Sequence, residues 1–187
     1  MQITNLPDFQ YKEFGLRNIR HSDIPQWYAY LSKPHVIQHT SWNLTGADDL
    51  LPQFDSYLSD EPNSPIRLAI VRKTDDLLIG TVGFHTISGL NRSAELAYDL
   101  APEYWGQRIA QVTSEVLCNW GFNEFALNRI QATVLESNIS SRKVLERTGF
   151  RQEGYLHAFR MVRGKPGNFW MYARLHPELK WNEAPAA

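Results

Sequence analysis

The sequence predicts a mixed α/β fold, with a mostly antiparallel central sheet and flanking helices. Helical and strand patterns follow one another in the order strand, two helices, three strands, helix, strand, helix and two strands. That order fits neither a doubly wound parallel sheet nor a sandwich. Two adjacent strand patterns are also joined by a short polar hairpin signal, which favours antiparallel pairing.

Composition narrows the classes of function. Of the 187 residues, 43% are hydrophobic, which is typical of a globular protein. The formal charge of −1 gives no positive electrostatic field that would attract nucleic acid. The single cysteine, Cys118, excludes an internal disulfide and a cysteine-based metal cluster. No apolar run is long enough to span a bilayer, and the first residues lack a signal-peptide pattern. We therefore expect a cytoplasmic protein without a membrane partner.

The first half of the chain holds two helices and four strands. Ser22 or Asp23 can cap the first helix, with Pro25 in its first turn, and Thr45 can cap the second. The segment KTDD joins two strands as a hairpin. The expected elements are a strand at 13–19, a helix at 21–32, an irregular stretch at 33–45, a helix at 45–60, and strands at 66–72, 77–88 and 93–101.

The second half alternates helices and strands before a final hairpin. Ile109, Val112, Val116 and Trp120 recur at helical spacing, and Gly149 can end the later helix. The turn RGKPG separates the last two strands. The expected elements are a helix at 106–126, a strand at 128–136, a helix at 137–150, and strands near 150–161 and 168–175. We expect one domain over 1–187, with a core at about 12–176 and a tail at 177–187.

The stretch PEYWGQRIAQ predicts an anion site. A strand ends at Pro102 and a helix begins near Gly106, so the first N–H groups of that helix are free and lie at the positive end of its dipole. Such a turn is a ready phosphate site, although Gly106 can equally serve an ordinary tight turn. Arg108 stands where a second glycine would let the backbone close on a phosphate. It also brings a guanidinium to that place.

A second stretch, SNISSRKVLERTGF, begins a helix with polar residues. Ser137 or Asn138 can cap it, and Asn138 shares a face with Ser141 near the helix start. Capping explains Asn138 well and Ser141 less well.

Together, SAELAYDLAPEYWGQRIAQ and RIQATVLESNISSRKVLERTGF resemble the GNAT acyltransferases, and more narrowly the RimJ/RimL-type N-acetyltransferases. The resemblance runs from GLRNIRHSD to NFWMYARL, and its two motifs stand in the right order and spacing. It implies the GNAT fold, whose sheet is splayed at a cofactor cleft. It also implies acetyl-CoA as the cosubstrate, without a metal.

The resemblance also assigns cofactor contacts. Pantetheine is expected along the main chain of strand 97–101, including Leu100, and Asn138 is expected to bond the cofactor arm. Gly106 and Ala110 match the family pattern, whereas Arg108 departs from it. Arg108 is expected to have a helical backbone conformation, from which its N–H can still donate to the phosphate. The residues expected at the pyrophosphate are Gly106, Gln107, Arg108, Ile109, Ala110 and Gln111.

Catalytic roles follow from the same resemblance. Ser141 is expected near the thiol as the proton donor, a role that tyrosine takes in many relatives. Glu95, on the cofactor strand, is the first choice of base, although it can also be an exposed strand charge. His85 and Asp99 are weaker candidates for the base. Strand alternation directs Tyr98 to the opposite face from Glu95, where it can line the cleft.

The acceptor is expected between two segments, 35–43 and 155–170, where Trp42, Phe159 and Trp170 line the cleft or belong to the core. A primary amine is expected, either a protein N-terminus or a small amine, and the protein is expected to be a monomer or homodimer. Alternatives are a non-catalytic CoA-binding module, or an acetyltransferase of an amino acid, polyamine or antibiotic.

Overall fold

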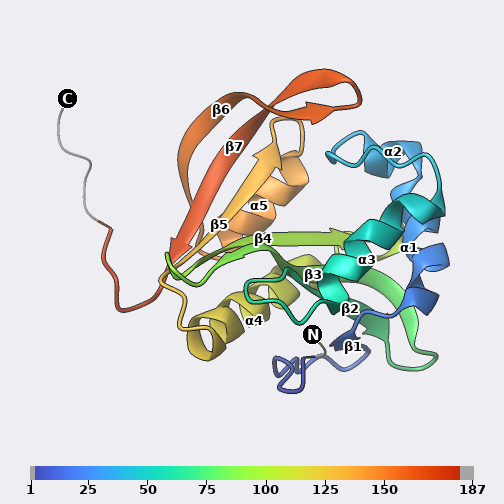
Figure 1. Ribbon diagram of the computed structural model, residues 1–187, viewed down its shortest axis with the longest axis horizontal. Coiled ribbons are helices and arrows are strands. Elements are labelled where there is room, and N and C mark those ends of the chain that lie inside the picture. Colours follow the sequence, from blue (N-terminus) through green and yellow to red (C-terminus); the bar gives the residue numbers. More distant parts are fainter. Residues whose placement is uncertain (1–2, 182–187) are drawn as a thin grey trace.

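A computed structural model describes residues 3–181 (Figure 1). Six residues of the expected tail, 182–187, lie outside the described part. No helix in the described part combines the length and apolar character needed to cross a bilayer. The main elements are β1 Phe14–Asn18, α1 Ile24–Leu31, α2 Pro34–Ile37, α3 Leu51–Leu58, β2 Ile66–Arg72, β3 Leu77–Ser88, β4 Ser93–Leu100, α4 Ile109–Glu124, β5 Arg129–Leu135, α5 Ile139–Arg147, β6 Arg151–Val162 and β7 Lys165–Leu175.

The strands form one seven-stranded sheet in the order β1-β2-β3-β4-β5-β7-β6. All neighbours pair antiparallel except β4 and β5, which are parallel. The β4–β5 pairing covers only 93–95 against 129–131, although both strands continue beyond it. Figure 1 shows the two strands diverging from that end. The predicted mostly antiparallel, splayed sheet is therefore confirmed.

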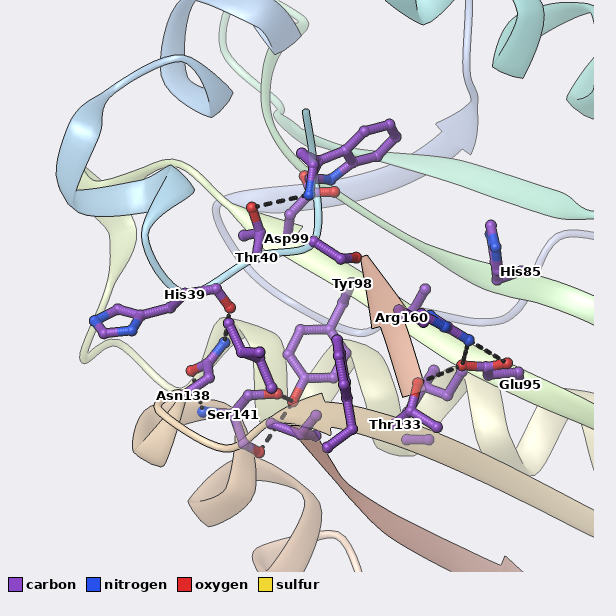
Figure 2. A pocket seen from close by; sticks show the side chains of 18 of the residues that line it. His39, Thr40, His85, Glu95, Tyr98, Asp99, Thr133, Asn138, Ser141 and Arg160 are labelled. Atoms are coloured by element: carbon purple, nitrogen blue, oxygen red, sulfur yellow. Dashed lines mark hydrogen bonds and ion pairs between the residues drawn. The ribbon is translucent and has the colours of Figure 1, made fainter. Parts of the chain in front are cut away.

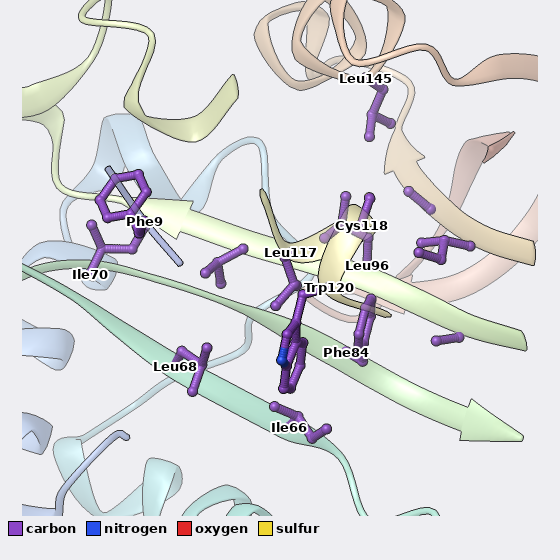
Figure 3. Packing of buried hydrophobic residues seen from close by; sticks show 14 of the residues in the cluster. Phe9, Ile66, Leu68, Ile70, Phe84, Leu96, Leu117, Cys118, Trp120 and Leu145 are labelled. Carbon is purple, nitrogen blue, oxygen red and sulfur yellow. The ribbon is translucent and has the colours of Figure 1, made fainter. Parts of the chain in front are cut away.

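Alternating side chains of the sheet supply two hydrophobic cores. Leu68 and Ile70 of β2 pack with Leu117 of α4 in one core, shown in Figure 3. Ala69 and Val71 pack on the other side with α1 and α3. Helix α4 approaches the sheet at Gly121, where a Cβ atom would lie 2.5 Å from the Phe84 ring. The sheet thus has α4 packed on one face and α1 and α3 on the other.

Three expectations about local structure were wrong. The stretch 33–45 contains the short helix α2, which Pro34 opens at its first position. Helix α4 begins at Ile109, three residues later than expected near Gly106. The last hairpin turns at Arg163 and Gly164 alone, because both residues have positive φ (48° and 76°), as a two-residue hairpin turn requires.

Candidate active site

A cleft of about 230 Å³ opens where β4 and β5 separate. Figure 2 shows side chains from the 39–42 loop, β4, β5, α5 and β6 converging on it. The residues from β4 that line it are Glu95, Leu96, Ala97, Tyr98 and Asp99. Because a strand alternates its side chains, these residues present two different faces to the gap.

Tyr98 and Ser141 meet across the gap. The Tyr98 hydroxyl lies 2.8 Å from Ser141 Oγ and 3.2 Å from the Ser141 carbonyl oxygen. Burial raises the pKa of Tyr98 well above its ordinary value, and the Ser141 hydrogen bond opposes this shift only in part. Both hydroxyls therefore carry protons throughout the physiological pH range. The pair contains two of the predicted catalytic residues, joined between β4 and the first turn of α5 (Figure 2).

Asn138 caps α5 and also holds the neighbouring loop. Its Oδ1 accepts a hydrogen bond of 3.0 Å from the Ser141 N–H, and its Nδ2 donates to the His39 carbonyl oxygen at 3.1 Å. The side chain of Asn138 therefore positions Ser141 relative to the 39–42 loop. Its predicted contact with the cofactor arm remains a prediction.

Glu95 lies on the face opposite Tyr98, as strand alternation predicts. Its Oε1 accepts hydrogen bonds from Thr133 Oγ1 (2.7 Å) and Arg160 Nη2 (2.9 Å), and its carboxylate is nearly buried. Sequence reasoning missed both partners. Arg160 lies 65 positions away along the chain, in β6. Glu95 is thus an ion-paired residue of the cleft rather than an exposed strand charge.

Asp99, on the same face as Glu95, is held by a network from three elements. Its carboxylate accepts hydrogen bonds from Tyr30, from Trp27 Nε1 (3.1 Å) and from Thr81 Oγ1 (2.7 Å). Arg67 Nη2 lies 3.9 Å from it. These bonds fasten α1 to the sheet, which is a structural use of the carboxylate.

His85 occupies a β-bulge at the edge of the cleft. Phe84 pairs with Leu96 and Thr86 pairs with Glu95, which leaves His85 as the extra residue of β3. Bulges commonly re-aim side chains near active sites. Partial burial, with Arg67 nearby, lowers the pKa of His85 below its usual 6.5. Its imidazole is therefore neutral at pH 7 and can accept a proton.

The loop before α4 presents a row of unused backbone donors. Within the described residues, the N–H groups of 106–111 make no hydrogen bonds, while the N–H of Val112 starts the helical pattern by donating to the Arg108 carbonyl oxygen. The Tyr11 hydroxyl donates to the Gln107 carbonyl oxygen at 3.3 Å, which attaches the loop to the N-terminal segment. Free amides at a helix N-terminus attract anions, as the sequence predicts for this segment.

Arg108 has a left-handed backbone, with φ 60° and ψ 8°. We expected a right-handed helical conformation there, and that expectation was wrong. The residue is the N-cap of α4 and lies outside the helix. It takes a left-handed conformation, which favours glycine, so a residue with a Cβ atom there carries backbone strain.

Other predicted residues are divided between the cleft and its surroundings. Leu100 packs in a core, and its carbonyl oxygen accepts a 2.7 Å hydrogen bond from Trp105 Nε1. Trp42 lines the cleft, together with Phe169, which sequence reasoning missed. Phe159 and Trp170 are absent from its lining. Alternation along β7 could have indicated Phe169, because neighbouring strand residues face opposite ways.

No cluster of three or more His, Cys, Asp or Glu side chains suited to a metal ion occurs among residues 3–181. The Nδ1 of His39 lies 3.3 Å from Ser137 Oγ.

Comparison with known proteins gives consistent matches. The family model described as the acetyltransferase (GNAT) domain matches residues 13–151. A Bacillus licheniformis protein named uncharacterized N-acetyltransferase p20 is 31% identical over 168 residues, covering 87% of this chain and 93% of that protein. The ribosomal-protein-serine acetyltransferase of Escherichia coli (strain K12) is 30% identical over 101 residues, covering 54% of this chain and 56% of that protein.

Among solved structures, the microcin C7 self immunity acetyltransferase MccE, in complex with acetyl-CoA and AMP, superposes with a TM-score of 0.78. It is 18% identical and covers 89% of this chain and 94% of that chain. At that identity, the likeness concerns the fold.

Proposed function

Because this chain belongs to the GNAT acetyltransferase family and is an N-acetyltransferase, we propose that it moves the acetyl group of acetyl-CoA to a primary amine by direct attack in a ternary complex. The observation that carries the proposal is the gap between β4 and β5, with the Tyr98–Ser141 pair facing into it. A thioester and an amine can meet there without a covalent enzyme intermediate.

The residues present fit acetyl-CoA. The free N–H groups of 106–111 are suited to its pyrophosphate, and a Cβ atom at Gly106 would meet nothing within 4 Å, so the loop is open on that side. The unpaired edge of β4 beyond Glu95 is suited to the pantetheine amides. When bound, acetyl-CoA supplies an activated acetyl group. The solved MccE structure with acetyl-CoA supports this fit.

The Tyr98–Ser141 pair is proposed to hold the proton that the departing thiolate takes up. A thiol of pKa about 8.5 is a fair leaving group, so the help required is modest. Tyr98 is buried and hydrogen-bonded to Ser141, and Ser141 is fixed by the cap from Asn138. This chain of hydrogen bonds supports Ser141 as the group that gives its proton to the thiolate, with Tyr98 hydrogen-bonded to the Ser141 hydroxyl.

Proton removal from the amine belongs to the opposite face of β4. Two side chains there can accept it: Glu95, the choice from sequence, and His85, whose lowered pKa leaves it neutral at pH 7. An α-amino group with a pKa near 8 is appreciably neutral at pH 7, so a weak base suffices. A lysine side chain would need a stronger one. This difference favours a protein N-terminus or a small α-amine, in line with the RimJ/RimL resemblance.

The test is release of free thiol from acetyl-CoA in the presence of a panel of amines. Transfer to at least one primary amine, with an acetylated product detected by mass, is the expected result. If acetyl-CoA binds but no acceptor in the panel causes thiol release, the chain is a non-catalytic CoA-binding module. Absence of acetyl-CoA binding would overturn the assignment of the cleft.

A further inference from the structure

We propose that the acceptor amine also carries a carboxylate, which Arg160 binds at the acceptor side of the cleft. The inference rests on the proposed function and adds a substrate class to it. Its basis is the pairing of the charged side chains of the cleft: the carboxylates are buried and hydrogen-bonded, whereas Arg160 keeps unpaired donors.

The two carboxylates of the cleft are already occupied. Glu95 accepts hydrogen bonds from Thr133 and Arg160, and its side chain is only 11% exposed. Asp99 accepts hydrogen bonds from Trp27 and Thr81 among others, and its side chain is 10% exposed. A cationic acceptor would therefore have to break buried hydrogen bonds to reach either carboxylate, which is costly.

Arg160, in contrast, keeps donors open. Both of its hydrogen bonds to Glu95 come from Nη2, at 2.9 and 3.3 Å, and its Nε and Nη1 have no hydrogen-bond partner within the described part of the chain. Its side chain is 33% exposed and lines the cleft. A guanidinium with free N–H groups matches the geometry of a carboxylate.

The position of Arg160 is fixed from three sides. Its guanidinium carbon lies 4.9 Å from the Phe159 ring centre and 5.8 Å from that of Phe169, and Glu95 holds Nη2. A side chain already held in place loses little freedom when it binds a ligand. Arg67 lies near the same face, but it is buried, donates to the Ala97 carbonyl oxygen and pairs with Asp99, so Arg160 is the exposed cation of this side.

A polycation is disfavoured by the same arrangement. The accessible charge of the acceptor side is positive, whereas the negative charges are buried and paired. An acceptor with one amine and one nearby carboxylate would place the amine at the thioester and the carboxylate on Arg160. Such a molecule can be a free amino acid or a peptide whose second residue is acidic.

The experiment compares paired acceptors by thiol release. One pair is a decapeptide beginning Ser-Asp against the same peptide beginning Ser-Asn; the other is glycylglycine against its primary amide, a small molecule whose α-amine has a pKa near 8. The carboxylate member should have a kcat/KM at least about tenfold higher in one pair or both, since charge-assisted hydrogen bonds are the strong ones. The pair that responds identifies whether the source is a peptide or a small molecule. Salt raised from about 0.01 M to about 1 M should shrink the ratio.

Variants assign the effect to Arg160. In Arg160→Gln the carboxylate of Glu95 loses its cation and faces the acceptor, so the preference should disappear or reverse. Arg160→Lys should keep part of it. Arg151→Gln is the matched control, since it removes a cation from the same strand at an exposed site that contacts Trp181 instead of the cleft.

The outcomes separate the two proposals. Transfer to amines with equal rates within each wild-type pair would overturn the carboxylate proposal and leave the acetyltransferase intact, even if Arg160→Gln fails to fold. Preference that survives unchanged in a folded Arg160→Gln would also overturn it. Lack of thiol release with any acceptor would instead contradict the proposed function itself.

Discussion

Arg108 departs from the family motif at a position with an unusual backbone. At φ 60° it holds a left-handed conformation, which favours glycine. Right-handed helical placement would have made glycine the worse residue at this position, whereas left-handed placement makes it the better one.

We therefore expect Arg108→Gly to be more stable than Arg108→Ala by about 1 kcal/mol in the free energy of unfolding, because the Cβ atom of alanine makes positive φ unfavourable and glycine has no Cβ atom. Chemical denaturation of the two variants measures this difference. A position inside the helix would give the opposite sign. If the guanidinium also contacts the phosphates, both variants should bind acetyl-CoA more weakly than the wild type, and with a smaller effect of salt.

The hydroxyls of Tyr98 and Ser141 should act as a unit. We expect Ser141→Ala and Tyr98→Phe each to lower kcat by about tenfold or more, with acetyl-CoA affinity nearly intact. The double variant should be little worse than the poorer single one, because the groups share one proton path. Ser140→Ala, on an exposed neighbouring position of α5, is the control. Fully multiplicative losses would show that the two hydroxyls work independently.

The pH dependence of kcat/KM distinguishes His85 from Glu95. If His85 is the base, the rate falls as pH drops through its lowered pKa, in addition to the decline from protonation of the α-amine near pH 8. The profile should steepen below pH 6.5 in the wild type and in Glu95→Asp, and His85→Gln should remove the steeper limb. Persistence of that limb in His85→Gln would assign it to another group.

At the scale of elements, Arg163 fastens the β6–β7 hairpin to the loop after α2. Its N–H donates to Asn43 Oδ1 at 2.7 Å, and its guanidinium donates to the carbonyl oxygens of Ile37 (2.8 Å), Thr40 (2.9 Å) and Gln38 (3.2 Å). Figure 1 shows the hairpin tip beside α2. The loop is thereby held at the hairpin, and Asn138 holds it at α5.

Removal of this attachment should make the loop at 38–43, next to the expected acceptor site, more mobile without changing the binding of acetyl-CoA. In Arg163→Gln, amide hydrogen exchange of 38–43 should accelerate and the acceptor KM should rise about tenfold, the effect of losing a charge-assisted bond or two. The acetyl-CoA dissociation constant should stay within about twofold. Lys165→Gln removes a nearby exposed charge as the control. Unchanged exchange in 38–43 would show that the loop is held without Arg163.

At the scale of the whole molecule, the sheet has two parts that meet in a short parallel pairing. Among the described residues, the strand pairing between the β1–β4 part and the β5–β7–β6 part is limited to 93–95 against 129–131, and side-chain bonds such as those of Glu95 to Thr133 and Arg160 add to it. A ligand lying in the gap contacts both parts and should stabilise the chain as one body.

We expect acetyl-CoA at about 100 times its dissociation constant to add about 2.7 kcal/mol to the free energy of unfolding. For a chain of this length, that corresponds to roughly 5–10 °C in melting temperature. Thermal denaturation with dephospho-CoA should show a similar shift, since the pyrophosphate remains, and free adenine should show none. A melting curve that saturating acetyl-CoA leaves unmoved would contradict binding in the cleft.

The sequence by itself determined most of the strands of this protein and the hairpin between the strands at 66–72 and 77–88. Strands 66–72 and 77–88 have the bounds expected from their patterns, because apolar runs and the KTDD turn are local signals. The placement of Tyr98 opposite Glu95 also followed from alternation alone. The family resemblance added the splay of the sheet at the cofactor cleft.

Only the tertiary structure decided which distant side chains meet. Arg160 reaches Glu95 from 65 positions away, Asn138 reaches His39 from 99, and Arg163 reaches Ile37 from 126. No local pattern encodes such pairs, since they depend on the twist of the sheet and on the hairpin folding back over α2. The conformation of Arg108 belongs to the same class: intrinsic preference favours a right-handed backbone, and the surrounding loop and the start of α4 override it.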